Sequence, residues 1–181
     1  NGINTRNFSV FNSKDINKDL PNVVILGTGG TIAGKGASSS NTAVYKAGAM
    51  DVNDLVSSVP EVLNVANCVA KGVLQKPSED MKVPDWIKMA EAAQSYLDQD
   101  DVDGIVVTHG TDTLEESSFF CHLVLRSDKP VVFTGAMRPA TALSADGGLN
   151  LLNAVVAAGS PVTRGLGSVV VMNEQLFSAR D

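Results

Sequence analysis

Two turns in this sequence place threonine hydroxyls directly after apolar runs. The turn 27–31 follows the run 23–26, and the turn 109–112 follows the run 104–108. A threonine hydroxyl is a poor nucleophile unless a base, a cation or a network of donors activates it. Backbone N–H groups in glycine turns can hold the negative charge that develops on oxygen during acyl transfer. The two turns therefore predict acyl-transfer chemistry, with Thr31 as the first candidate for the reacting group.

The glycine-rich stretch 27–36 admits two other interpretations. The dinucleotide-binding pattern G-x-G-x-x-G fails, because Ile32 stands where the third glycine is required. The phosphate-binding pattern G-x-x-x-x-G-K-[ST] matches from Gly29 to Lys35, but Gly36 follows and has no hydroxyl for a magnesium ion. Nucleotide binding therefore ranks below nucleophilic catalysis. Taken alone, the stretch also fits a tight turn without chemistry.

Apolar and amphipathic segments alternate along the chain, and this alternation predicts the elements that hold the turns. Buried strands are expected at 22–28, 104–108, 130–134 and 168–172, one or two more within 62–74, and helices at 51–56, 83–99, 113–126 and 146–158. This spacing predicts an α/β fold, a three-layer open and mainly parallel sheet with helices on both faces. Both threonine turns then emerge at the carboxyl edge of the sheet, where such folds bind ligands.

Local details of this pattern can be checked against a structure. The spacing of apolar residues in 83–99 directs Trp86, Ile87, Ala90, Ala93 and Leu97 inward. Thr113 and Glu116 fit a capping box at the start of the following helix. The turn 76–80, which carries Ser78 and Glu79, has the composition of an exposed loop.

Several candidate side chains also have a purely structural interpretation. Thr111 and Asp112 lie where a helix N-terminus favours hydroxyls and carboxylates, so capping and function stand at even odds on spacing alone. Tyr45, on the long loop 35–50, could relay a proton for the nucleophile or simply pack. His109 is expected to be a hydrogen-bonded structural residue rather than a catalytic base.

The composition argues against several classes of protein. The chain has 181 residues, 44% hydrophobic and 19% charged, which is typical of one globular domain. A formal net charge of -6, without a run of lysine or arginine, argues against nucleic-acid binding. No apolar stretch reaches the roughly 20 residues that cross a bilayer. Cys68 and Cys121 are too few for a disulfide framework or a metal site, and we expect two buried thiols and no cofactor.

The ends of the chain differ from its middle. Residues 1–20 are expected to form an extended polar arm, and 21–181 the α/β domain. The sequon Asn7-Phe8-Ser9 weakly favours an exported protein. Because an apolar strand lies just before Asp181, we expect the chain to be a fragment whose C-terminal part is missing.

Four motifs together resemble the bacterial-type L-asparaginases, specifically the type II enzymes and their glutaminase-asparaginase relatives. They are GTGGTIAG (27–34), HGTDTLEES (109–117), TGAMRPAT (134–141) and SADGGLNLLNAV (144–155). The resemblance runs from about Leu20 to Asp181. It implies an amidohydrolase that converts L-asparagine to L-aspartate and ammonia through an acyl-threonine, with L-glutamine as a candidate second substrate and no cofactor.

The resemblance also implies roles for individual residues. The expected catalytic set is Thr31, Tyr45, Thr111 and Asp112, with Thr31 as the nucleophile. The expected substrate-binding set is Ser78, Glu79, Thr111, Asp112 and Ala136. Ser78, Glu79 and Asp112 would hold the α-carboxylate and α-amino groups, and the carbonyl of Ala136 would accept a hydrogen bond from the amide nitrogen. Glutamate rather than glutamine at position 79 resembles members with more relaxed glutamine activity.

Some features of the family pattern are absent from this sequence. The family's catalytic lysine lies a few residues beyond the Arg180-Asp181 that closes this sequence, and its C-terminal domain is also missing. We therefore expect the 181-residue chain alone to have little or no activity, and the full-length parent to be an extracytoplasmic homotetramer, periplasmic or secreted. The rival hypothesis is a binding module, either an amino-acid sensor or an inactive remnant of the fold.

Overall fold

The computed structural model describes residues 10–11, 16–30, 32, 34–36, 45–46 and 51–181. Thr31, most of the arm 1–20 and the sequon lie outside the described residues, as do the side chains of 35–36 and 45–46. The strands are β1 (Asn22–Gly29), β2 (Lys35–Gly36), β3 (Tyr45–Lys46), β4 (Asn67–Lys76), β5 (Gly104–Thr108), β6 (Val131–Thr134), β7 (Ser168–Met172) and β8 (Gln175–Ser178). The α-helices are α1 (Val52–Ser57), α2 (Val83–Leu97), α3 (Leu114–Val124) and α4 (Gly147–Gly159).

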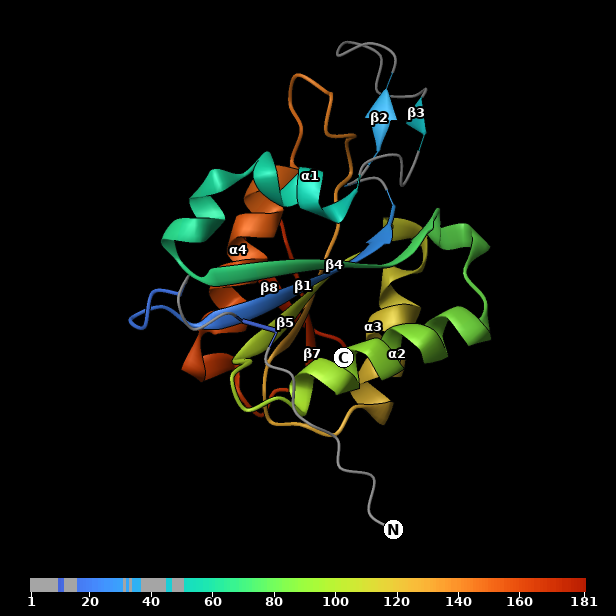
Figure 1. Ribbon diagram of the computed structural model, residues 1–181. Helices are drawn as coiled ribbons and strands as arrows, with labels where there is room; N and C mark the ends of the chain where they lie inside the picture. Colours follow the sequence, from blue (N-terminus) through green and yellow to red (C-terminus); the bar gives the residue numbers. More distant parts are fainter. Residues whose placement is uncertain (1–9, 12–15, 31, 33, 37–44, 47–50) are drawn as a thin grey trace.

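A six-stranded sheet in the order β4-β1-β5-β6-β7-β8 forms the middle layer (Figure 1). The pairs β4–β1, β1–β5, β5–β6 and β6–β7 are parallel, and β8 returns antiparallel to β7. The central strands are buried on both faces, which is why β1, β5 and β6 are apolar runs rather than alternating sequences. The predicted α/β fold with a mainly parallel sheet is confirmed.

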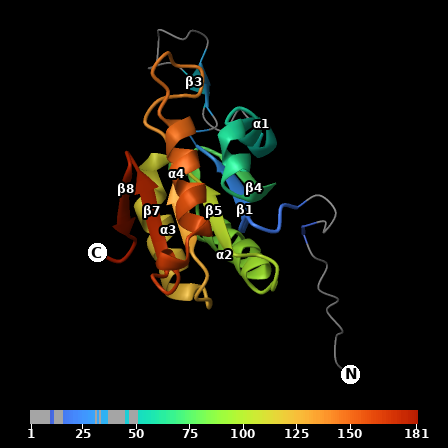
Figure 2. The same ribbon diagram turned by 90° about the vertical axis from the view of Figure 1, so that its left-hand side faces the viewer.

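Helices cover both faces of this sheet. On one face Ile25 and Val106 pack with Leu151 of α4 and with residues of α1, and on the other Leu26 and Phe133 pack with residues of α2 and α3. Figure 2 views the molecule from the α4 side, with α4 in front of the strands and β8 at one edge. Successive residues of β1 therefore serve opposite cores, as the period of a strand requires.

Short 3-10 turns also connect these elements. They are η2 (Pro60–Asn64), η3 (Ser78–Asp80), η4 (Thr111–Thr113) and η5 (Pro161–Thr163). η3 follows β4 and η4 follows β5. Both turns therefore lie at the carboxyl ends of the two strands that flank β1. The turns that carry the candidate side chains are thus short and hydrogen-bonded to the framework.

Local predictions fail where a tertiary contact decides the outcome. Ile87 of α2 is 45% exposed, whereas Met89 is fully buried, because the helix turns its 89-90-93-97 face toward the sheet. Thr113 makes no side-chain cap bond to α3, because its hydroxyl donates instead to the Ser78 carbonyl at 2.9 Å. The predicted capping box is therefore wrong.

Two strand pairings were not anticipated. The hairpin strand β8 pairs with β7 through a turn at Asn173 and Glu174, both of which have positive φ. Within the expected loop 35–50, β2 pairs antiparallel with β3, which places the backbone of Tyr45 opposite Gly36.

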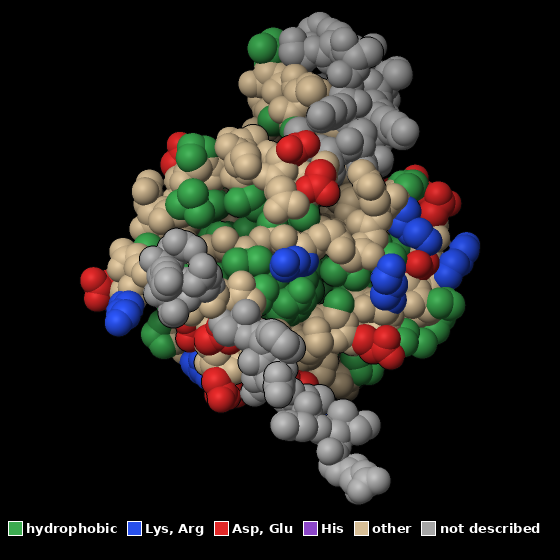
Figure 3. All heavy atoms as spheres, in the orientation of Figure 1, with side chains coloured by type: hydrophobic (Ala, Val, Ile, Leu, Met, Phe, Trp, Pro, Cys, Tyr) green, Lys and Arg blue, Asp and Glu red, His purple; other side chains and the backbone are tan. Residues whose placement is uncertain are grey.

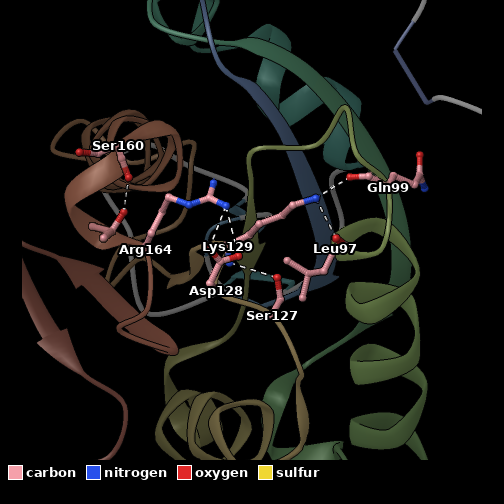
Figure 4. Close-up of polar contacts among 8 residues, drawn as sticks. Leu97, Gln99, Ser127, Asp128, Lys129, Ser160 and Arg164 are labelled. Carbon is pink, nitrogen blue, oxygen red and sulfur yellow. Dashed lines mark hydrogen bonds and ion pairs between the residues drawn. The ribbon is translucent and has the colours of Figure 1, made fainter.

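The amino-terminal edge of the sheet is held by charged side chains (Figure 4). Lys129 Nζ donates to the carbonyls of Leu97 at 2.8 Å and Gln99 at 2.5 Å, at the end of α2. A cation there is favourable, because the carbonyls of the last helical turn lack partners within the helix. Arg164 forms an ion pair with Asp128 at 3.1 Å. These contacts lie at the strand ends opposite to the turns that carry the candidate residues.

The described residues also show how charges, apolar helices and potential metal ligands are distributed. On the face drawn in Figure 3, basic and acidic side chains are interspersed. Among the helices in the described part of the chain, none is both long and apolar enough to cross a membrane. Within the described ranges, no three His, Cys, Asp or Glu side chains are grouped to hold a metal ion. Cys121 is buried and Cys68 half-buried, and both are free thiols.

Candidate active site

The turn after β1 touches the turn after β5. Gly29 and Gly30 adopt φ values of 105° and 79°, which side-chain-bearing residues rarely adopt. A methyl group on Gly30 would overlap the backbone of Gly110, so the two glycine backbones are in direct contact. The convergence of the two turns at one sheet edge is thus present in the structure. Thr31 follows Gly30 directly in the chain, although its own position is not described.

The segment after β4 adds a third turn to this contact. A Cβ atom on Gly110 would lie 2.5 Å from Ser78 Oγ, so the serine hydroxyl packs against the Gly110 backbone. Ser78 is 1% exposed, and its Oγ has no hydrogen-bond partner among the described residues. A buried hydroxyl without a partner is costly, so it is a natural place for a polar ligand group to bind. Its neighbour Glu79 is exposed.

The buried ring of His109 holds the turn after β5. The ring is fully buried, with Nδ1 2.7 Å from the Gly110 carbonyl and Nε2 3.1 Å from Met81 Sδ. Burial lowers the pKa of His109 below its ordinary value, so the neutral ring predominates at pH 7. Because a carbonyl can only accept, Nδ1 carries the proton and donates it to Gly110. His109 is the hydrogen-bonded structural residue that the sequence predicts.

Thr111 and Asp112 belong to the η4 turn, which follows His109 and Gly110 in the chain. Thr111 is half-buried, and its methyl group faces Gly135, where an added Cβ would lie 3.2 Å away. Asp112 is exposed. The N-cap position of α3 is Thr113, not Thr111 or Asp112, and it makes no cap bond. The structural alternative, in which Thr111 and Asp112 cap the helix, therefore has no hydrogen bond to support it among the described contacts.

A fourth turn, after β6, carries Ala136. Its methyl group faces Gly147 at the start of α4, and Ile32 packs against the same glycine. The buried Ala136 and the residue that follows Thr31 thus meet at one point of the helix. The turns after β1, β4, β5 and β6 therefore form one continuous edge of the molecule.

Two polar side chains at the start of α4, neither of them a candidate from the sequence, hold the Ala136 turn. The Asp146 carboxylate accepts from the backbone N–H groups of Met137 and Arg138, each at 2.9 Å. Asn150 donates from Nδ2 to the Gly135 carbonyl at 3.1 Å. The available signal was the motif 144–155 itself, in which Asp146 and Asn150 are spaced to share one face of a helix.

A cavity of about 350 Å³ lies along β4 and the end of β1, and none of the described candidate residues lines it. It is lined by Gly29 and Thr108 at the strand ends, by residues of α1 and β4, and by Lys88 of α2. Thr28 Oγ1 donates to the Thr108 carbonyl at 2.8 Å, which ties the two strand ends together at its wall. The edge that carries the candidate residues thus combines a buried unpartnered hydroxyl with close-packed glycine backbones.

The predicted site residues fall into three groups. The structure brings Ser78 and Thr111 together around Gly110, and it places Ala136 on the adjoining turn. Asp112 and Glu79 stand exposed beside Thr111 and Ser78. Thr31 and the side chain of Tyr45 lie outside the described residues.

Comparisons with known proteins show the family of the chain. The family model described as Asparaginase, N-terminal, matches residues 22–181. The chain is 50% identical over 163 residues to L-asparaginase 2 of Bacillus subtilis, covering 90% of this chain and 44% of that protein. It is 49% identical to a glutaminase-asparaginase of Pseudomonas fluorescens (90% and 45% covered), and also 49% identical to a probable periplasmic L-asparaginase of Haemophilus influenzae (90% and 46% covered).

A solved structure is similar as well. The crystal structure of a probable cytoplasmic L-asparaginase from Campylobacter jejuni has a TM-score of 0.86 and 41% sequence identity, covering 88% of this chain and 49% of that chain. The chain spans about half the length of the curated relatives it matches. Since the family model matches residues 22–181, which include the six-stranded sheet and the described α-helices, the chain belongs to the asparaginase family, of which it carries the N-terminal domain.

Proposed function

We propose that the protein is an amidohydrolase that converts L-asparagine and water to L-aspartate and ammonia. One observation carries the proposal: the Gly30 and Gly110 backbones touch, and the unpartnered Ser78 hydroxyl packs against Gly110. This contact brings three turns with reactive or polar side chains within reach of one small ligand. Membership of the asparaginase family supports amide hydrolysis as the reaction.

In the proposed mechanism Thr31 is the nucleophile. Its Oγ attacks the side-chain carbonyl carbon of asparagine, and Tyr45 and Thr111 are the proposed relay that carries the hydroxyl proton to the departing nitrogen. The carbon–nitrogen bond then breaks, ammonia leaves with the added proton, and an acyl ester on Thr31 remains. Water hydrolyses that ester and regenerates the hydroxyl. Turn N–H groups would stabilise the oxyanion of both steps.

Substrate recognition is proposed to rest on the flanking turns. Ser78 would donate to the α-carboxylate, a role supported by its buried and unpartnered hydroxyl. Asp112 and Glu79 would hold the α-ammonium group, and both are exposed carboxylates, next to the half-buried Thr111 and the buried Ser78 respectively. The carbonyl of Ala136 would accept a hydrogen bond from the substrate amide nitrogen. In this proposal Asp112 and Glu79 attract the substrate by charge, and the hydrogen bonds of Ser78 and Ala136 orient it.

The wider properties are proposals too. L-glutamine is a second proposed substrate, since a relative at 49% identity is named a glutaminase-asparaginase. We propose export because of the sequon at Asn7. One relative is named as periplasmic and one solved structure as cytoplasmic, so cell fractionation is the test of this proposal. We propose that the 181-residue chain alone is inactive and that the complete protein is a homotetramer.

Ammonia release tests the proposal. The complete gene product and the 181-residue chain are assayed side by side with L-asparagine and L-glutamine, each with Thr31→Ala. We expect ammonia from the complete protein, little or none from the 181 residues, and loss of activity in Thr31→Ala. As a matched control, Ser95→Ala removes an exposed hydroxyl of α2 that donates to the Ala92 carbonyl, and it should leave the rate unchanged.

Two outcomes would overturn it. Saturable binding of L-aspartate by a complete protein that releases no ammonia would establish the binding module instead. Saturable binding of ATP with magnesium, without binding of aspartate, would favour the phosphate-loop interpretation of 29–35.

A further inference from the structure

We propose that Asp146 is a positioning residue, which holds the peptide after Ala136 so that the Ala136 carbonyl oxygen faces the substrate amide. The inference rests on the proposed function, because it concerns the same site. It adds a residue that acts through the backbone and does not touch the substrate.

The first step concerns how Asp146 is bound. Its Oδ2 accepts from the Met137 N–H and its Oδ1 from the Arg138 N–H, each at 2.9 Å. Hydrogen bonds to an ionised carboxylate are shorter and about twice as strong as neutral ones. Two successive N–H groups gripped by one carboxylate leave the turn little freedom to rotate.

The second step follows from the planarity of the peptide bond. The N–H of Met137 and the C=O of Ala136 belong to the same rigid unit, and in a trans peptide they point in opposite directions. When Asp146 fixes the Met137 N–H toward α4, the Ala136 oxygen must point away from α4. The carboxylate therefore sets the direction of the proposed substrate acceptor without contacting it.

The third step is a second clamp on the preceding peptide. Asn150, which is 3% exposed, donates from Nδ2 to the Gly135 carbonyl at 3.1 Å and to Asp146 Oδ2 at 3.3 Å. Its Oδ1 accepts from the Asn173 N–H at 3.0 Å. Both peptides that flank Ala136 are thus held by side chains from the first turns of α4.

The charge of Asp146 is also balanced locally. Arg138 Nε lies 3.9 Å from Asp146 Oδ1, and the carboxylate sits at the N-terminus of the 13-residue helix α4. A negative charge is favourable at that end of a helix. The positions of Arg138 and of the helix end therefore favour the carboxylate of Asp146 as the acceptor for both N–H donors.

The inference is testable because it separates amide from ester substrates. An acceptor for the amide N–H matters for L-asparagine but not for the β-methyl ester of L-aspartate, which has no such hydrogen. In Asp146→Asn one carboxylate oxygen is replaced by an NH₂ group, which cannot accept a hydrogen bond, so at least one of the two N–H groups loses its partner. We expect kcat/KM for L-asparagine to fall by about 10- to 100-fold, the scale of a misplaced catalytic contact, and the ester value to fall far less.

Asn150→Ala should show the same preference, because it removes the second clamp. Asp128→Asn is the matched control, since it makes the same chemical change in an exposed ion pair at the opposite edge of the sheet, and it should alter neither substrate. The assays use the complete gene product. Equal losses on the amide and the ester would show a merely structural role and would overturn the inference.

Amide hydrogen exchange keeps the inference independent of folding and of activity. In the wild-type protein the Met137 and Arg138 N–H groups should exchange slowly despite their exposed side chains. Exchange at the rate of an unprotected peptide would refute the clamp even if Asp146→Asn does not fold. A wild-type protein that releases no ammonia, with these two amides protected, would refute the proposed function and leave the clamp without a substrate role.

Discussion

Gly110→Ala is the sharpest structural test of the candidate site. Gly110 has φ -78° and ψ 148°, which any residue can adopt, so alanine introduces no backbone strain there. The new Cβ would lie 2.5 Å from Ser78 Oγ, 2.7 Å from Ser78 Cβ and 3.2 Å from Gly30 Cα. The effect of this substitution therefore comes from steric overlap alone.

The size of the effect follows from these distances. Ordinary contacts of a Cβ atom begin near 3.4 Å, so Ser78 and the Gly30 turn must move apart by about 1 Å. Extra atoms in a close-packed region cost about 1–3 kcal/mol in the free energy of unfolding. For a chain of this length that corresponds to a loss of roughly 2–12 °C in Tm. A 1 Å displacement of the turns would also lower kcat/KM of the complete enzyme by about 100-fold.

Thermal and urea unfolding measure the stability change, and ammonia release measures the activity. Gly72→Ala is the matched control, because nothing lies within 4 Å of a Cβ at Gly72 and its φ is not positive. We expect Gly72→Ala to be neutral or slightly stabilising, since alanine restricts the unfolded chain. A Gly110→Ala protein with an unchanged Tm and full activity would refute the close contact of the three turns.

Three further predictions follow from the structure. Lys129→Met removes the donor to the Leu97 and Gln99 carbonyls and should lower the free energy of unfolding by about 1.5–3 kcal/mol, measured by urea unfolding; no loss would show that water replaces the ammonium group. Burial depresses the pKa of His109 in the folded state, so the unfolded state binds the extra proton and stability should fall as pH drops below about 6.5, an effect that should be absent in His109→Gln. Burial raises the pKa of the Cys121 thiol to about 12, so a thiol reagent at pH 8 should label Cys121 only after denaturation, and rapid labelling of the native protein would contradict its burial.

The sheet and the meeting of the turns could be predicted from the sequence because both depend on strong local signals. Apolar runs at 23–26 and 104–107 can be buried only in the middle of a sheet, and parallel strands bring their following turns to one edge. The contact between Gly30 and Gly110 then follows from the pairing of β1 with β5. The family resemblance is confirmed by the match over residues 22–181.

What the sequence could not provide depends on partners that are distant in the chain. Thr113 has the sequence pattern of a helix cap, but its hydroxyl donates to the Ser78 carbonyl of another turn instead. The orientation of α2 against the sheet, rather than its apolar spacing, decides that Ile87 is exposed. Asp146 looks like an ordinary residue at a helix start until the Ala136 turn is seen folded over it. The roles of Thr31 and Tyr45 stay predictions.

The hydrogen bond from the Asn173 N–H to Asn150 has a practical meaning for dissecting the domain. A version shortened before position 173 would remove this donor, leaving the Oδ1 of a buried asparagine to find water in a packed interior. The same side chain holds the Gly135 carbonyl, so the loss would reach a turn 38 positions earlier in the chain. The smallest piece that keeps the Ala136 turn intact must therefore include the first residue of the β7–β8 hairpin turn, although that residue lies well outside every recognisable motif.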